Sequence, residues 1–195
     1  MTPDGTVLAT HRAARTIDAF SATAVEAEKM FTKLVDLEKR ASSGDVAAKK
    51  ELFRLKLDMG SYDLAGAKAM IAQLGLTAEE LAAVQPKLAS METKDLLGSI
   101  TSRQDTAGFE RVANRFAEMA KAGTTPPKGD LQEFQGFWII LMDHYAAPKK
   151  DVALYETALG LLKKEFGENP RARAFFESKE KALEEMKEAT KKGTE

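Results

Sequence analysis

The sequence predicts a mainly α fold of stacked antiparallel helical hairpins, preceded by a short N-terminal strand and turn. Three observations lead to this class. Helix-forming residues (Ala, Leu, Lys, Glu and Met) dominate the composition. Apolar residues recur at three- and four-residue spacing along almost the whole chain. Clusters of Gly, Pro, Asn, Asp and Ser then divide the chain into segments of helical length joined by short turns, which favours antiparallel neighbours.

The first dozen residues differ from the rest. Residues 3–5, Pro-Asp-Gly, have the composition of a tight turn, and residues 6–10, Thr-Val-Leu-Ala-Thr, form a short β-type run. A lone strand leaves its backbone N–H and C=O groups unpaired, and the sequence offers no second convincing strand. We therefore expect this strand to pair with another chain, which predicts a homodimer through the N-terminal strand.

The first predicted helix runs from an N-cap at Thr16 to about Arg40. Its apolar residues fall at helical spacing and predict one stripe: Ile17, Phe20, Ala24, Ala27, Phe31 and Leu34. Residues 42–44, Ser-Ser-Gly, end this helix, and Asp45 caps the next one. Residues 60–62, Gly-Ser-Tyr, then separate two further helices that carry Leu52 to Met59 and Leu64 to Leu74.

The central helices are marked by a capping box and by a proline. Thr77 and Glu80 have the spacing at which each side chain satisfies an unpaired N–H of the first helical turn. Pro86 predicts a kink or the start of a new helix. A loop is expected over residues 102–108, and the next apolar stripe, from Phe109 to Met119, ends at Gly123.

The C-terminal part begins after residues 124–129, which form the clearest linker. A helix starting at Asp130 is nearly apolar all round and is expected to be central. Residues 146–148, Ala-Ala-Pro, turn the chain into a partner helix that carries Val152 to Phe166. Asn169 as N-cap and Pro170 at the first helical position begin the last helix. We expect domain boundaries at 1–40, 41–123 and 124–195, with the last two parts packed as one domain.

Composition excludes several classes of function. The formal net charge is −1, with 29 basic and 30 acidic side chains, so neither nucleic acid nor an anionic membrane is an expected partner. The chain has no cysteine, which excludes a thiolate nucleophile, a Cys-ligated zinc and a Cys-x-x-Cys redox motif within it. The longest apolar run, residues 137–142, is too short to cross a bilayer, and no signal-peptide pattern is present. The sequence indicates no particular cellular compartment.

No catalytic, metal or cofactor site is predicted. His11 and His144 lack partners at the spacing that metal binding or acid–base chemistry needs. The acidic pairs at residues 79–80 and 184–185 are adjacent on helices, so their side chains point about 100° apart and do not share a substrate.

The best candidate for a partner-binding surface is an aromatic group near the C-terminal linker. Its members are Phe134, Phe137, Trp138, Tyr145 and Tyr155. Such a group is interpreted either as the core between two helices or as an amphipathic groove open to a protein or peptide. The second interpretation makes Phe134, Trp138, Tyr145 and Tyr155 the candidate partner-binding residues.

Two segments resemble known families. Gly60, Tyr62, Ala65 and Ala72 stand as glycine, aromatic and small residues do in a tetratricopeptide hairpin, although the tryptophan, the Leu-Gly pair and the final proline of that consensus are absent. Residues 3–38, with the Pro-Asp-Gly turn, the Val-Leu strand and the following long helix, resemble the end of a thioredoxin-like domain. That family's redox cysteines and cis-proline lie before this hairpin, so no redox residue is carried over.

Together these features predict a non-catalytic, degenerate tetratricopeptide-like module, associated with a thioredoxin-like domain, that binds a protein or peptide. The alternative is the C-terminal part of a thiol–disulfide oxidoreductase whose redox cysteines lie in an N-terminal half outside this sequence.

Overall fold

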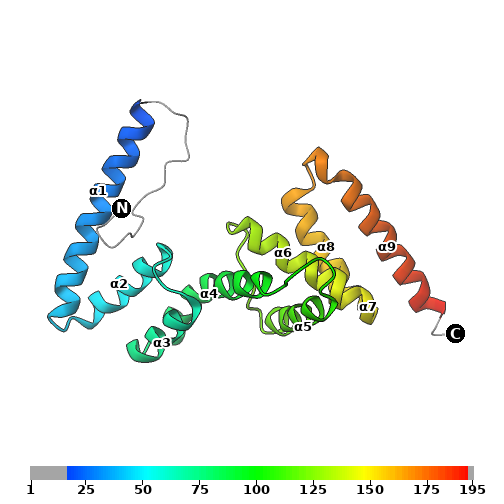
Figure 1. The fold of residues 1–195 in the computed structure, drawn as a ribbon, viewed down its shortest axis with the longest axis horizontal. Coiled ribbons are helices and arrows are strands. Elements are labelled where there is room, and N and C mark those ends of the chain that lie inside the picture. The colour runs from blue at the N-terminus through cyan, green and yellow to red at the C-terminus, as the bar shows by residue number, and fades with distance from the viewer. Residues whose placement is uncertain (1–16, 193–195) are drawn as a thin grey trace. The chain divides into compact units, whose positions relative to one another are not determined.

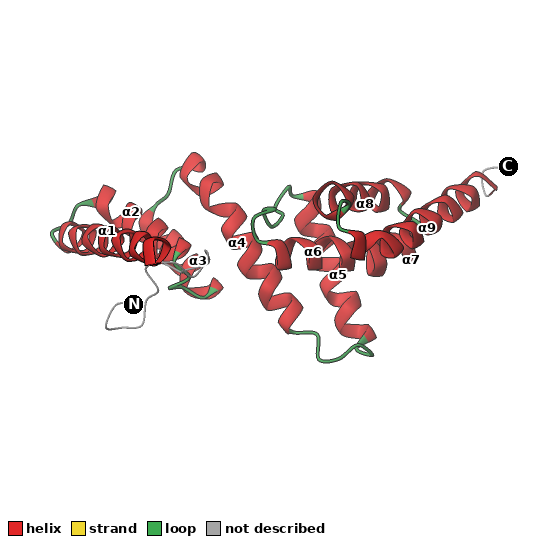
Figure 2. Cartoon of the chain, turned by 90° about the horizontal axis from the view of Figure 1, so that it is seen from above, coloured by secondary structure: helices red, strands yellow, loops and turns green. Residues whose placement is uncertain are grey.

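The computed structural model describes residues 17–192, and all the regular elements in this range are helical (Figures 1 and 2). The mainly α class is therefore confirmed. The predicted strand at residues 6–10, the homodimer contact through it, and His11 lie outside the described residues. In chain order the elements are α1 Ile17–Ser42, α2 Val46–Asp58, α3 Leu64–Leu74, α4 Ala78–Gly98, α5 Thr106–Lys121, α6 Leu131–Leu141, a π-helical turn η1 Met142–Ala146, α7 Ala147–Lys149, α8 Val152–Phe166, a 3-10 turn η2 Pro170–Ala172 and α9 Arg173–Lys192.

Aspartate side chains start several of these helices by accepting a hydrogen bond from a backbone N–H of the first turn. Asp45 accepts from Ala48 N–H at 3.0 Å, and Asp151 accepts from Leu154 N–H at 3.0 Å; Asp63 and Asp105 begin α3 and α5 in the same way. These caps satisfy donors that have no partner inside the helix. The predicted cap at Asp45 is confirmed, and Asn169 caps the 3-10 turn η2 that leads into α9 rather than α9 itself.

The predicted capping box at the start of α4 is also present. The Glu80 N–H donates to Thr77 Oγ1 at 3.2 Å, and the Thr77 N–H donates to Glu80 Oε2 at 2.8 Å. Pro86 does not begin a new helix, because α4 continues through it to Gly98. An interior proline removes one helical hydrogen bond, and the burial of Val84, Leu88 and Ala89 beside it supplies the packing that offsets this loss.

The chain divides into two compact units, one reaching to Val84 and the other beginning at Gln85. This division falls at a different place from the expected boundaries at 40 and 123. Residue 40 lies inside the first unit because α1 packs along α2. Residue 123 lies inside the second unit because α5 packs against α6, and the predicted linker between them holds Pro126 fully buried.

The first unit is organised around the hairpin of α1 and α2 (Figure 1). Its buried apolar residues come from α1, α2, α3 and the start of α4: Leu34, Leu37, Ala48, Phe53, Leu57, Ala67 and Val84. The Phe53 ring lies 5.6 Å from the ring of Tyr62, in the turn before α3. Ion pairs Lys33–Glu51 at 2.9 Å and Lys56–Glu38 at 2.7 Å also join α1 to α2.

The second unit has its core where α5, α6 and α8 meet. Fully buried residues come from each of these elements and from the π-helical turn: Val112, Ala113, Phe116, Phe137, Leu141, Met142, Tyr155, Ala158 and Leu162. The last helix, α9, packs on α8 with Phe176 and Leu183 buried. The prediction of a central, nearly apolar helix after Asp130 is confirmed by α6.

Candidate interaction surfaces

The predicted aromatic group lies mostly inside the core of the second unit. Phe134, Trp138 and Tyr155 are buried, and Phe137 is 0% exposed. The Phe137 ring is 4.5 Å from the Phe116 ring and 5.0 Å from the Trp138 ring, and the latter pair is edge-to-face, a favoured arrangement of buried aromatic residues. The burial of these four side chains agrees with the interpretation of the group as core between helices.

Burial also shapes the acid–base properties of Tyr155. Its side chain is 1% exposed, and loss of hydration raises the pKa of its phenol to about 12, with the negative charge of Asp143 adding to the effect. The phenol is therefore neutral at any physiological pH and offers no anionic group for catalysis.

Tyr145 is the one member of the group with a half-exposed side chain. Lys149 Nζ lies 3.8 Å from the centre of its ring, and Lys121 Nζ lies 6.0 Å from it. A cation over an aromatic face at such distances is attracted by the ring. The exposed face of Tyr145 is thus engaged by lysines of the same chain.

The π-helical turn sends three successive side chains to three different neighbours. Lys179 Nζ of α9 donates to both carboxylate oxygens of Asp143 at 2.7 and 2.8 Å. His144 stacks on Phe109 of α5, with ring centres 4.3 Å apart, and Tyr145 meets the two lysines. His144 therefore has a packing role, and the residues that the structure describes hold no cluster of three or more potential metal ligands.

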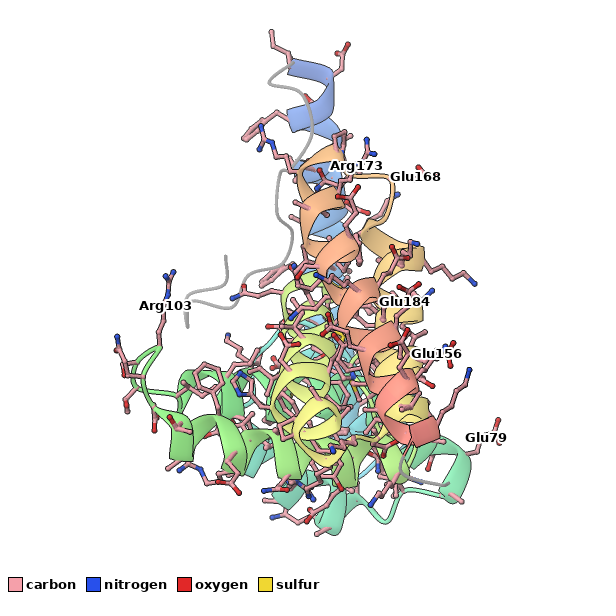
Figure 3. All side chains as sticks on the ribbon, turned by 90° about the vertical axis from the view of Figure 1, so that its right-hand side faces the viewer. Glu79, Arg103, Glu156, Glu168, Arg173 and Glu184 are labelled. Atoms are coloured by element: carbon pink, nitrogen blue, oxygen red, sulfur yellow. The ribbon has the colours of Figure 1, made fainter. Side chains whose placement is uncertain are left out.

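The Glu79–Glu80 pair does not act as a pair. Glu79 is exposed and projects outward from its helix (Figure 3). The Glu80 carboxylate instead binds Lys50 Nζ at 2.7 Å and Arg54 at 3.2 Å, joining α2 to the start of α4. The hydrogen bond from Lys50 and the bond from the Thr77 N–H lower the pKa of Glu80. Its role in the structure is a tie between helices.

The apolar stripe predicted on the first helix is largely exposed on α1, which the sequence did not predict. Ile17 is 84% exposed, Val35 48% and Phe31 43%, and Phe20 and Val25 are exposed as well. At 100° per residue, Ile17, Phe31 and Val35 project within about 40° of one another. We call Ile17, Phe20, Phe31 and Val35 the α1 stripe.

The expected apolar face of α1 is buried only in part. Leu34 and Leu37 are buried, and at 100° per residue Leu34 projects about 60° from Phe31, so the buried and the exposed apolar residues adjoin on the helix. Val35 and Leu37, absent from the predicted stripe, add one exposed and one buried apolar residue to this helix.

No helix in the described part of the chain is long and apolar enough to cross a membrane. Comparison of the sequence with protein-family models and with curated proteins, and of the structure with solved structures, gave no match.

Proposed function

We propose that the chain is a non-catalytic, tetratricopeptide-like interaction module of antiparallel helical hairpins that works beside a thioredoxin-like domain. The observation that carries this proposal is the α1 stripe. Exposed apolar residues gathered on one helix face are the usual mark of an interaction surface. Burying the exposed 43% of Phe31 alone removes about 85 Å² from water, which is worth about 2 kcal/mol.

The resemblance of residues 3–38 to the end of a thioredoxin-like domain gives this face a role. In that family the C-terminal helix follows the last strand, and α1 holds this place in the resemblance. One face of α1 already packs on α2 through Leu34 and Leu37. The α1 stripe adjoins these buried residues and leaves apolar surface for such a domain to cover.

The packing of consecutive helices supports the hairpin array. The chain reverses through short turns between α1 and α2 and between α8 and α9, and the members of each pair contact each other. Between α8 and α9, Lys187 pairs with Glu156 at 2.9 Å and Lys163 pairs with Glu180. Helical arrays of this kind bind partners through extended surfaces and need no catalytic residues.

The test is a capture experiment with the immobilised chain and an extract of the source cells. Mass spectrometry then identifies any thioredoxin-like proteins that bind. Phe31→Glu with Val35→Glu places two charges on the α1 stripe. Leu131→Glu is the matched control, because Leu131 is also an exposed apolar residue but lies on α6. We expect capture of a Cys-x-x-Cys domain of this fold by the native chain and by the control, and loss of capture by the double variant. Capture of no such domain, or equal capture by the double variant, would refute the proposal.

The alternative is that the chain is part of a thiol–disulfide oxidoreductase. In that case the α1 stripe would contact a redox domain of the same polypeptide. An in-frame Cys-x-x-Cys codon pattern upstream in the gene would support it. Insulin reduction measured on the present chain tests whether the chain itself is a catalyst. The non-catalytic proposal expects the rate of the uncatalysed reaction, and turnover above that rate would overturn it.

A further inference from the structure

A cleft in the second unit has features of a small-ligand site. It lies between α6, α8 and the start of α9 and has a volume of about 320 Å³. Apolar residues make most of its wall: Ile139, Leu162, Phe166, Phe175 and Phe176. This volume is at the lower end of the range for small-molecule sites, which are mostly apolar with a few polar groups.

The apolar wall has a rigid base and an accessible side. Leu162 and Phe176 are buried, so they form the base. Phe166 and Phe175 are half-buried, so each keeps part of its ring accessible in the cleft. The Phe175 and Phe176 rings pack edge-to-face with centres 5.3 Å apart, which holds both rings in place.

Arg171 supplies the only charge among the residues that line the cleft. Its guanidinium forms no ion pair with a carboxylate of the described residues, whereas Arg173, two residues later, donates to Glu177 at 2.8 Å. Figure 3 shows Arg173 near the same end of α9, outside the cleft lining. An unpaired guanidinium beside an apolar wall is suited to a planar anion, since its N–H groups match the two oxygens of a carboxylate.

Two amide side chains complete the polar part of the cleft. The Oδ1 atom of Asn169 accepts from the Arg171 N–H at 3.0 Å, so its Nδ2 group is left to donate. Gln135 adds a second amide from α6. The polar groups therefore offer donors next to a positive charge, and no acidic side chain lines the cleft.

We propose that this cleft binds a small amphipathic carboxylate, with its carboxylate at Arg171 and its hydrocarbon part against Phe166 and Phe175. At about 30 Å³ for each water-sized group, the cleft holds about ten such groups. Octanoate and 3-phenylpropionate have this size and this separation of charge from apolar surface. The inference is independent of the α1 stripe and of any thioredoxin-like partner.

Isothermal titration calorimetry of the full chain with octanoate tests the proposal, with octanamide and acetate as probes that lack the charge or the apolar part. Arg171→Gln removes the charge at an exposed position, so the fold is expected to persist, which circular dichroism checks. Arg173→Gln is the matched control, two residues away and outside the cleft. We expect saturable binding of octanoate to the native chain and unchanged binding of octanoate to R173Q. Binding of octanoate to R171Q, and of octanamide to the native chain, should be at least tenfold weaker. Acetate should not bind.

Three results would overturn the proposal. No binding of octanoate or 3-phenylpropionate at millimolar concentration would show that the cleft holds no such ligand. Equal binding of octanamide and octanoate would show an apolar patch without anion recognition. Equal weakening by R171Q and R173Q would show a general effect of positive charge.

Discussion

Replacing Phe137 and Phe31 by alanine, one at a time, tests whether the core and the α1 stripe have been assigned correctly. Both are phenylalanines within helices, but Phe137 is 0% exposed and Phe31 is 43% exposed. The same atoms are removed in each variant. Differences in the free energy of unfolding therefore report the surroundings of the two rings.

Phe137→Ala is expected to lower the free energy of unfolding by about 3–5 kcal/mol, the usual range when a buried Phe is replaced by Ala. The substitution removes buried surface and leaves a cavity beside Phe116 and Trp138. Phe31→Ala also removes buried surface, but it leaves no closed cavity and alanine has the higher helix propensity, so the loss should be smaller, about 2 kcal/mol or less. With a urea m-value of about 2 kcal/mol/M, the Phe137 variant should unfold at about 2 M lower urea.

The assay is urea unfolding followed in two ways. Trp138 is the only tryptophan, so its fluorescence reports the second unit, and circular dichroism reports the helices of both units. A midpoint shift below about 0.5 M for Phe137→Ala would refute the core assignment. A loss for Phe31→Ala as large as that for Phe137→Ala would refute the exposure of the α1 stripe.

Three further predictions concern titration and capping. Burial raises the pKa of Tyr155 to about 12, so its neutral form stabilises the fold below pH 10, and this stability is lost as the pH rises toward 12. In thermal melts at a series of alkaline pH values, the melting temperature of Tyr155→Phe should therefore fall less steeply with pH than that of the native chain. The pKa of Glu80 is lowered, mainly by Lys50, so its contribution is present above the unfolded pKa of about 4.3 and is lost as the pH falls further. Glu80→Gln should therefore flatten the acid side of the same profile, and an unchanged acid slope would contradict the tie to Lys50. Asp151→Ala removes the cap on the Leu154 N–H and should cost about 1 kcal/mol in urea unfolding, whereas no loss would show that the cap is dispensable.

Local signals in the sequence predicted much of the helical organisation. The caps at Asp45, Asn169 and the Thr77–Glu80 box are set by residues within a few positions of each other, so they can be identified without knowledge of the fold. The central position of α6 follows in the same way from its apolar composition.

What the sequence could not predict depends on contacts distant along the chain. Phe31 and Leu34 have similar apolar character, and only the docking of α2 determines that Leu34 is buried while Phe31 stays exposed. The cleft likewise joins α6 to the start of α9, which no local pattern brings together. The continuation of α4 through Pro86 rests on packing that outweighs a local propensity.

The π-helical turn at Met142–Ala146 has a consequence for how this sequence is to be aligned with others. The Ala147 N–H donates to the Met142 carbonyl, five residues earlier, so the turn holds one residue more than an α-helix would. One residue corresponds to about 100° of rotation, so a chain lacking it would present different side chains after this point. An ancestral α-helix that gained a single residue here is a simple origin for the turn. A relative without the insertion would then match α6 and α8 only across a one-residue gap, and its counterparts of Asp143 and Tyr145 would face other neighbours.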